Sequence, residues 1–260
     1  MRLMLDAFMA KYAGYTLQEV YYDPQKNFDA LRKVAMDFDI DVIGAYTSIW
    51  WAGLHDAVGM EYYEFAGYKL EESRQFQYIE DEYMKEDEYD HLLDDPSDFL
   101  LRVYTPRVFS NLKGLSLLPP LKSLAFGCYG TFIYGFALSV PETRTAIQNF
   151  LDMAKPAADY AIKTGEFHAK MHDEGQLCSH GAPTLHPFDI ISDLLRGMRG
   201  TMLDMFQVPD KLHSAMEKLY PLSLGNALNI AEATGNRQMF IPLHRGADGF
   251  MSPKQFEEYY

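Results

Sequence analysis

The chain has 260 residues, 48% of them hydrophobic, which is enough for a sizeable core and one or two domains. Its formal net charge of −14 argues against binding nucleic acids or anionic lipid, because both are negatively charged. No apolar run is long enough to span a bilayer, the N-terminus lacks a signal-peptide pattern, and two cysteines form no disulfide framework. We therefore expect a soluble cytoplasmic protein that binds neither nucleic acid nor membranes.

The first part of the chain has the order strand, helix, strand. A short apolar run ends at Asp6, and residues 41–46 have the composition of a buried strand. Between them, Asp23 is a candidate N-cap and Pro24 a candidate first residue of a helix whose apolar residues recur at helical spacing. This order is typical of a parallel sheet.

The middle of the chain, from about residue 60 to 175, interrupts this pattern. Residues 69–83 alternate like a hairpin, and the acidic residues 80–82 are predicted to be its turn. Helices are predicted from Pro96 to about Leu112 and from Pro141 to about His172. Between these helices lies a run rich in glycine and aromatic residues, in which Cys128 is predicted to be buried and inert. We expect this region to be an insertion made of helices and a hairpin.

The last third returns to strands followed by helices. Further strands are predicted near residues 177–185 and 239–243, and a long helix begins at Pro209 and ends at Gly235. Ser252, Pro253 and Gln255 match the start of a final helix. With residues 2–6 and 41–46, this makes at most four parallel strands, each followed by a helical stretch. Four such units are half of an eight-fold barrel, and an open four-stranded sheet is the alternative.

Polar or aromatic residues follow each predicted strand. They are Asp6, then Tyr46, Ser48 and Trp50, then His186, then His244, Arg245 and Asp248. If the strands are parallel, these side chains gather at one rim. Each also has an ordinary structural interpretation: Asp6 as a helix cap, Trp50 as a core residue, and His244 as a buried, hydrogen-bonded histidine.

One group of residues invites a zinc interpretation. His168 and His172 are spaced by one helical turn, and Cys178 and His180 follow shortly afterwards. The spacing matches no standard zinc motif, so chance histidines at a surface helix end are the favoured interpretation. We predict no metal ligand from spacing.

Several segments along nearly the whole chain resemble the uroporphyrinogen decarboxylase superfamily. They are residues 6–14 (DAFMAKYAG), 22–24 (YDP), Gly59, 82–90 (EYMKEDEYD), 95–99 (DPSDF), 187–197 (PFDIISDLLRG) and 244–250 (HRGADGF). The resemblance implies a single (β/α)8 TIM barrel with its active cleft at the C-terminal rim. Residues 1–260 would then form a single partial barrel domain, the first half with about four βα units, plus the insertion at about 60–175.

The superfamily contains the decarboxylase, which needs no cofactor, and methyltransferases that use zinc. These methyltransferases move a methyl group between a corrinoid protein and a thiol or pterin. The chain departs from the decarboxylase pattern: the loop from Asp6 to Lys11 has no arginine, Ser48 stands where the decarboxylase has an aspartate, and Asp193 where it has a tyrosine. The resemblance therefore favours the methyltransferase branch, with zinc ligands expected beyond residue 260.

From these patterns and the resemblance we expect one active cleft. Its expected catalytic residues are Asp6, Ser48, His244 and Arg245, with His244 as a proton donor or ligand and Arg245 holding an anionic group. Its expected substrate-binding residues are Tyr46, Trp50, His186, Asp189, Asp193, Asp248 and Phe250. Zinc and a corrinoid are expected by resemblance only, the partner is a corrinoid protein or a tetrapyrrole-type substrate, and a homodimer is possible. The alternatives are uroporphyrinogen III decarboxylation and a non-catalytic subunit that binds a corrinoid protein.

Overall fold

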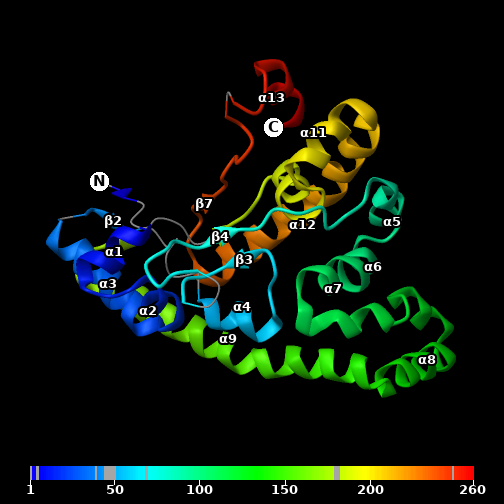
Figure 1. Cartoon of the computed structure of the whole chain (residues 1–260), viewed down its shortest axis with the longest axis horizontal. Helices are drawn as coiled ribbons and strands as arrows, with labels where there is room; N and C mark the ends of the chain where they lie inside the picture. Colours follow the sequence, from blue (N-terminus) through cyan, green and yellow to red (C-terminus); the bar gives the residue numbers. More distant parts are fainter. Residues whose placement is uncertain are drawn as a thin grey trace. The chain divides into compact units, whose positions relative to one another are not determined.

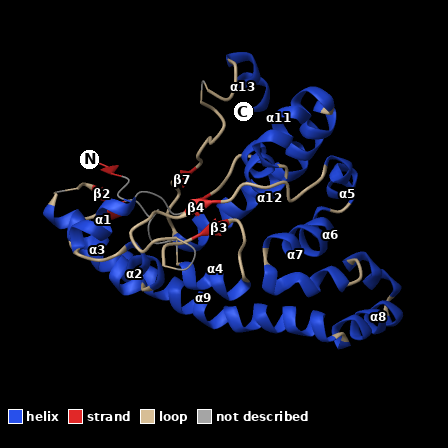
Figure 2. Ribbon diagram, viewed as in Figure 1, coloured by secondary structure: helices blue, strands red, loops and turns tan. Residues whose placement is uncertain are grey.

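The computed structural model describes residues 2–3, 6–38, 40–43, 51–67, 70–178, 182–247 and 249–260. Helices make up 71% of the structure and strands 5%, and Figure 2 shows this predominance of helix. Each described strand is only two residues long. The chain is therefore α-rich and is not a complete (β/α)8 barrel, whose centre consists of eight longer strands.

The chain divides into two compact units. Unit 1 contains residues 1–79, 109–114 and 139–179, and unit 2 contains residues 80–108, 115–138 and 180–260. The predicted insertion at 60–175 contributes to both units. Its status as an insertion into a single barrel domain stays a prediction.

Unit 1 combines helices with a small parallel sheet (Figure 1). Its helices are α1 (Asp6–Ala13), α2 (Leu17–Tyr22), α3 (Pro24–Asp37), α4 (Ala52–Val58) and the long α9 (Pro141–Asp173). Its parallel strands are β1 (Arg2–Leu3), β2 (Val42–Ile43) and β5 (Leu177–Cys178), in the order β1-β2-β5. The predicted parallel pairing of these three segments is confirmed over the described residues.

The start of α3 is the one that the sequence predicts. The Asp23 carboxylate accepts hydrogen bonds from the backbone N–H groups of Gln25 and Lys26, and Pro24 occupies the first turn. These bonds satisfy donors that a helix N-terminus otherwise leaves open. The apolar face of α3 then packs against α9, where the rings of Phe28 and Phe167 stack with centroids 4.7 Å apart.

The predicted hairpin is present but is shifted along the sequence. Strands β3 (Tyr63–Glu64) and β4 (Gln77–Tyr78) pair antiparallel, with Tyr63 opposite Tyr78. The acidic residues 80–82 are therefore not its turn, and they belong to unit 2. Aromatic contacts across the strand pair, such as Tyr63 with Tyr78 at 5.5 Å, stabilise this register instead of the predicted one.

Unit 2 is mostly helical. Its elements are η2 (Glu86–Glu88), α5 (Tyr89–Asp94), α6 (Pro96–Phe99), η3 (Leu100–Tyr104), α7 (Thr105–Val108), η5 (Leu121–Phe126), α8 (Cys128–Ser139), α10 (Pro187–Asp189), η6 (Ile190–Leu195), α11 (Gly197–Gln207), α12 (Pro209–Thr234) and α13 (Pro253–Tyr259). The last residue of α8 belongs to unit 1, and η4 (Ser110–Leu117) is shared between the units. Strands β6 (Ala182–Pro183) and β7 (Met239–Phe240) pair in parallel.

Two helix ends in unit 2 confirm local predictions. Gly235 ends α12 in the left-handed conformation, with φ of 69°, which suits glycine because it has no Cβ. Ser252 and Gln255 form a reciprocal capping box at the start of α13.

The prediction for Cys128 is wrong, because this cysteine is exposed at the start of α8. Among the described residues, no helix is long and apolar enough to cross a membrane.

Candidate functional site

The candidate site in unit 2 follows two neighbouring parallel strands. Thr184, just after β6, donates its backbone N–H to the carbonyl of Phe240 in β7 at 3.0 Å. Because the strands run in the same direction, the segments that leave their carboxyl ends start from one edge. The segment after β6 leads into α10 and η6, which carry Asp189 and Asp193. The segment after β7 carries His244 and Arg245.

Asp193 is the centre of the site. Its Oδ2 lies 2.5 Å from Nδ1 of His244, and its Oδ1 lies 2.9 Å from Nη2 of Arg245. Asp193 is buried, whereas the side chain of His244 is 43% exposed. The buried carboxylate thus orients both basic groups and leaves part of the imidazole accessible to a ligand.

A second carboxyl group, Asp189, lies fully buried one helical turn before Asp193. Its Oδ1 accepts a hydrogen bond from the hydroxyl of Tyr260, and that hydroxyl accepts one from the backbone N–H of Arg245 at 3.2 Å. Within the described part of the chain, its Oδ2 has no hydrogen-bond partner, and neither does the buried Nε of Arg245. The site therefore holds an acceptor and a donor whose hydrogen-bonding capacity is unused, which is uncommon for buried groups.

Glu80 completes the surroundings of Arg245. Its Oε2 lies 3.3 Å from Nη2 of Arg245, and its Oε1 accepts a hydrogen bond from the backbone N–H of Met198. Sequence reasoning missed Glu80, because the acidic run in which it lies has the composition of a solvated turn. It also missed Tyr260, and the helix predicted to begin at Pro253 was the only signal that placed this residue near a folded element.

The pKa values of three groups in the site, His244, Asp189 and Tyr260, are raised above their ordinary values. The hydrogen bond that His244 donates to Asp193 raises the pKa of His244, and the electrostatic interaction with Asp189 adds to this effect. Burial raises the pKa of Asp189, and repulsion by Asp193 raises it further. Burial and the bond to Asp189 raise the pKa of Tyr260. The arrangement favours a protonated imidazole beside a carboxyl group that is costly to ionise, which is the property of an acid–base site.

The structure brings together four of the predicted site residues, Asp189, Asp193, His244 and Arg245. Two more lie nearby. The ring of His186 is 4.8 Å from that of Tyr260, and the ring of Phe250 lies 5.6 Å from the guanidinium carbon of Arg245. Nδ1 of His186 also accepts the backbone N–H of Phe188 at the start of α10, and burial lowers the pKa of His186.

The structure does not test where the side chains of the other predicted site residues lie. Tyr46, Ser48, Trp50 and Asp248 lie outside the described residues. Asp6 is the first residue of α1 in unit 1, and only its backbone is described. Their place in one cleft with His244 stays a prediction.

The site does not suit the zinc ion that the family resemblance implies. Among the described residues, Asp189, Asp193 and His244 present ligand atoms within 4.8 Å of one another. However, both oxygens of Asp193 are engaged, one by His244 and one by the guanidinium of Arg245, whose charge repels a divalent cation. This group also contains no cysteine thiolate, which is a preferred ligand of zinc. We therefore assign no zinc ligands within it.

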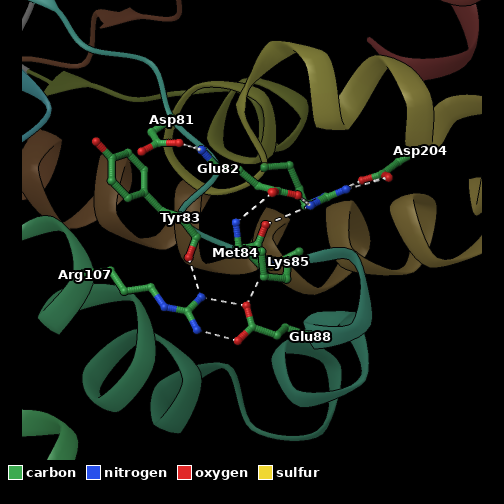
Figure 3. A network of polar contacts seen from close by, with 9 residues as sticks. Asp81, Glu82, Tyr83, Met84, Lys85, Glu88, Arg107 and Asp204 are labelled. Carbon is green, nitrogen blue, oxygen red and sulfur yellow. Dashed lines mark hydrogen bonds and ion pairs between the residues drawn. The ribbon is translucent and has the colours of Figure 1, made fainter.

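A second arginine cluster in unit 2 has a different character (Figure 3). Arg196 binds both carboxylate oxygens of Asp204, at 2.6 and 3.0 Å, and its Nη1 bonds Glu82 and the carbonyl of Met84. Each of its guanidinium nitrogens therefore has an acceptor, and Tyr89 donates a further bond to Asp204 at 2.8 Å.

A neighbouring ion pair adjoins this cluster (Figure 3). Arg107 binds the carbonyl of Tyr83 at 2.7 Å and both oxygens of Glu88. These saturated networks tie the segment 82–88 to the helices of unit 2. Because the charged groups of both networks are paired with one another, we interpret the networks as structural.

No known protein family matches the chain, and neither a curated protein nor a solved structure has significant similarity to it. The candidate site therefore has to be interpreted from its own chemistry.

Proposed function

We propose that the cluster of Asp189, Asp193, His244 and Arg245 is the active site of an enzyme of the uroporphyrinogen decarboxylase superfamily. The observation that supports this is the meeting of these residues after the carboxyl ends of the parallel strands β6 and β7. Active sites of βα folds lie at this end of the strands. The parallel pairings β1-β2-β5 and β6-β7 follow the chain order, which is consistent with the first half of a (β/α)8 barrel.

The reaction we propose is methyl transfer between a corrinoid protein and a thiol or pterin. Charge balance favours it over uroporphyrinogen decarboxylation. A substrate with several carboxylates needs unpaired cations, yet Arg245 is already bonded to Asp193 and lies 3.3 Å from Glu80. The further carboxyl group, Asp189, adds no positive charge that could bind such a substrate. An uncharged or cationic reacting group suits this site better.

In this proposal His244 supplies a proton. Asp193 raises the pKa of the imidazole, holds it by Nδ1 and leaves Nε2 to act on the substrate. Donation of the proton to an amine nitrogen makes that nitrogen a better leaving group when its methyl group departs. Arg245 and Asp189 carry the unused donor and acceptor at the same place, and these would position a polar group of the substrate.

The test uses the purified full chain with a corrinoid protein, a methylated pterin and a thiol. We expect methyl transfer, followed by the change in corrinoid absorbance, and no decarboxylation of uroporphyrinogen. Decarboxylation without methyl transfer would replace the proposal with the alternative enzyme. Binding of the corrinoid protein without either reaction would identify a non-catalytic subunit.

A further inference from the structure

Helix α8 has an unusual surface for a protein of this charge. Its sequence is CYGTFIYGFALS, and no charged residue occurs between Lys122 and Glu142, although the whole chain carries a net charge of −14. A helix that is apolar on nearly all sides is normally covered by other protein. In this structure most of its side chains are exposed.

One face of α8 is fixed to its own unit. The hydroxyl of Tyr134 donates to the carbonyl of Pro119 at 2.7 Å. Gly130 lies so close to the chain before the helix that a Cβ there would come within 2.1 Å of the carbonyl oxygen of Ser123. This tight contact needs a glycine and sets the rotation of the helix about its axis. The face of α8 that carries Gly130 and Tyr134 therefore lies against the backbone of Pro119 and Ser123, and the aromatic side chains lie on another face.

The exposed face carries an apolar stripe. Tyr129, Phe132, Ile133 and Phe136 follow one another at helical spacing and are 73%, 61%, 46% and 74% exposed. Leu124 and Phe126 continue the apolar surface before the helix. Together these six side chains expose about 700 Å², more than the largest apolar patch of a typical monomer and close to the roughly 800 Å² that one partner contributes to a stable interface.

We propose that the α8 stripe is the contact surface between two copies of this chain. Two molecules of charge −14 repel each other, so a stable contact between copies needs a surface without charges at its centre. The segment from Ser123 to Pro141 is such a surface. The same absence of lysine and arginine makes α8 unlike the basic amphipathic helices that lie on membranes.

The stripe is also self-complementary. When two α8 helices cross antiparallel about a two-fold axis near Phe132 and Ile133, Tyr129 of each copy meets Phe136 of the other. Each of these contacts is made twice, as a two-fold interface requires. Aromatic pairs of this kind add to the free energy gained from burying their area.

The experiment is sedimentation velocity of the full chain and of the variant Phe132→Glu/Phe136→Glu. We expect a wild-type mass of twice 29.8 kDa and a dissociation constant at least about 100-fold higher in the variant, because two charges enter the centre of the interface in each copy. The matched control is Phe206→Glu on α11, since Phe206 is 75% exposed but lies outside the stripe. This control should stay dimeric.

A monomeric wild type, or a dimer that the double variant leaves intact, would overturn the proposal. Binding of a monomeric wild type to phosphatidylcholine vesicles would assign the stripe to a membrane surface instead. Far-UV circular dichroism checks that the glutamate variant is folded. If it is not, the pair Phe132→Ser/Phe136→Ser replaces it under the same criterion, with a smaller expected change.

Discussion

Two arginines of unit 2, the buried Arg196 and the partly buried Arg245, are both paired with aspartates, yet their surroundings differ. Every guanidinium nitrogen of Arg196 has an acceptor, and Asp204 is bonded from two residues. Nε of Arg245 has no partner, and the nearby Asp189 keeps an unused oxygen. A saturated network contributes to stability and can bind nothing more. A network with unsatisfied buried groups lowers the stability of the free protein, and this stability is regained when a ligand or proton binds.

The difference also appears in accessibility. The Arg196–Asp204 pair is closed to solvent on both sides, with side chains 5% and 0% exposed, whereas the Asp193–His244 pair joins a buried carboxylate to a partly exposed imidazole. A proton can reach His244 from outside, and Asp193 keeps it there. Under the proposed function, the Arg196 cluster has a structural role and the Asp193 cluster a chemical one, so substitutions in the two clusters should affect stability in opposite directions.

The largest expected effect is on activity. His244→Gln removes the proton donor and should lower the kcat of methyl transfer by about 10²- to 10⁴-fold. Because His244 is partly exposed, the free energy of unfolding should change little. His213→Gln is the matched control, since His213 also lies in unit 2, is similarly exposed, and pairs with a carboxylate, that of Glu258 at 3.4 Å. Wild-type kcat in His244→Gln would show that the cluster is not catalytic.

The largest expected effect on stability comes from Asp204→Asn. It leaves the charge of Arg196 buried without its main partner, which should lower the free energy of unfolding by about 3–5 kcal/mol. Glu88→Gln is the control, because its partner Arg107 is partly exposed and such pairs contribute about 1 kcal/mol or less. Urea denaturation measures both. Equal losses in the two variants would contradict a structural role specific to the Arg196 cluster.

Asp189→Asn should raise the free energy of unfolding, which is the opposite of the effect expected for Asp204→Asn. Burial raises the pKa of Asp189, so the wild type loses stability as pH rises from 3.8 through the folded-state pKa. The amide keeps the bond from Tyr260 without that cost, and the variant should be about 0.5–2 kcal/mol more stable at neutral pH but less active. The gain should vanish at acid pH, where the carboxyl group is protonated in both states. A variant less stable than wild type at neutral pH would count against a functional origin of the unsaturated cluster.

The smallest expected effect concerns the titration of His244. Asp193 raises its pKa, so the pair contributes stability that is fully present below pH 6.5 and is lost as pH rises through the folded-state pKa. The contribution should be less than about 1 kcal/mol, because the imidazole is partly exposed. Asp193→Asn should lower the pKa of His244 toward 6.5, as measured by NMR titration of the ring protons. An unchanged pKa would show that His244 and Asp193 do not interact in solution.

Much of the helical structure and part of the site could be predicted from the amino-acid sequence. The start of α3 at Pro24 and the capping box of α13 depend on side chains that bond to backbone groups at most three residues away. The span of α12 depends on Pro209 in its first turn and on Gly235 at its end. The parallel pairing of the predicted strands followed from their alternation with helices. Because His244 and Arg245 directly follow one of these strands, their place at the strand end was predictable.

Other features escaped prediction for a common reason. The register of the β3–β4 hairpin depends on ring contacts between strands, and the exposure of Cys128 depends on which side of α8 meets the rest of unit 2. The partnership of Glu80 with Arg245 spans 165 residues of sequence, and that of Tyr260 with Asp189 spans 71. No local pattern encodes contacts over such separations.

Local sequence was enough to predict the starts of α3, α9 and α13, the span of α12 and the parallel direction of the described strand pairs, because these features depend on neighbouring residues and on composition. Only the tertiary structure decided which arginine is saturated and which keeps an unused donor. Arg196 and Arg245 are the same residue type, each near acidic residues, and nothing local distinguishes them. Their difference arises from how many acceptors the fold brings within about 3 Å of each guanidinium, and burial then makes any missing acceptor costly.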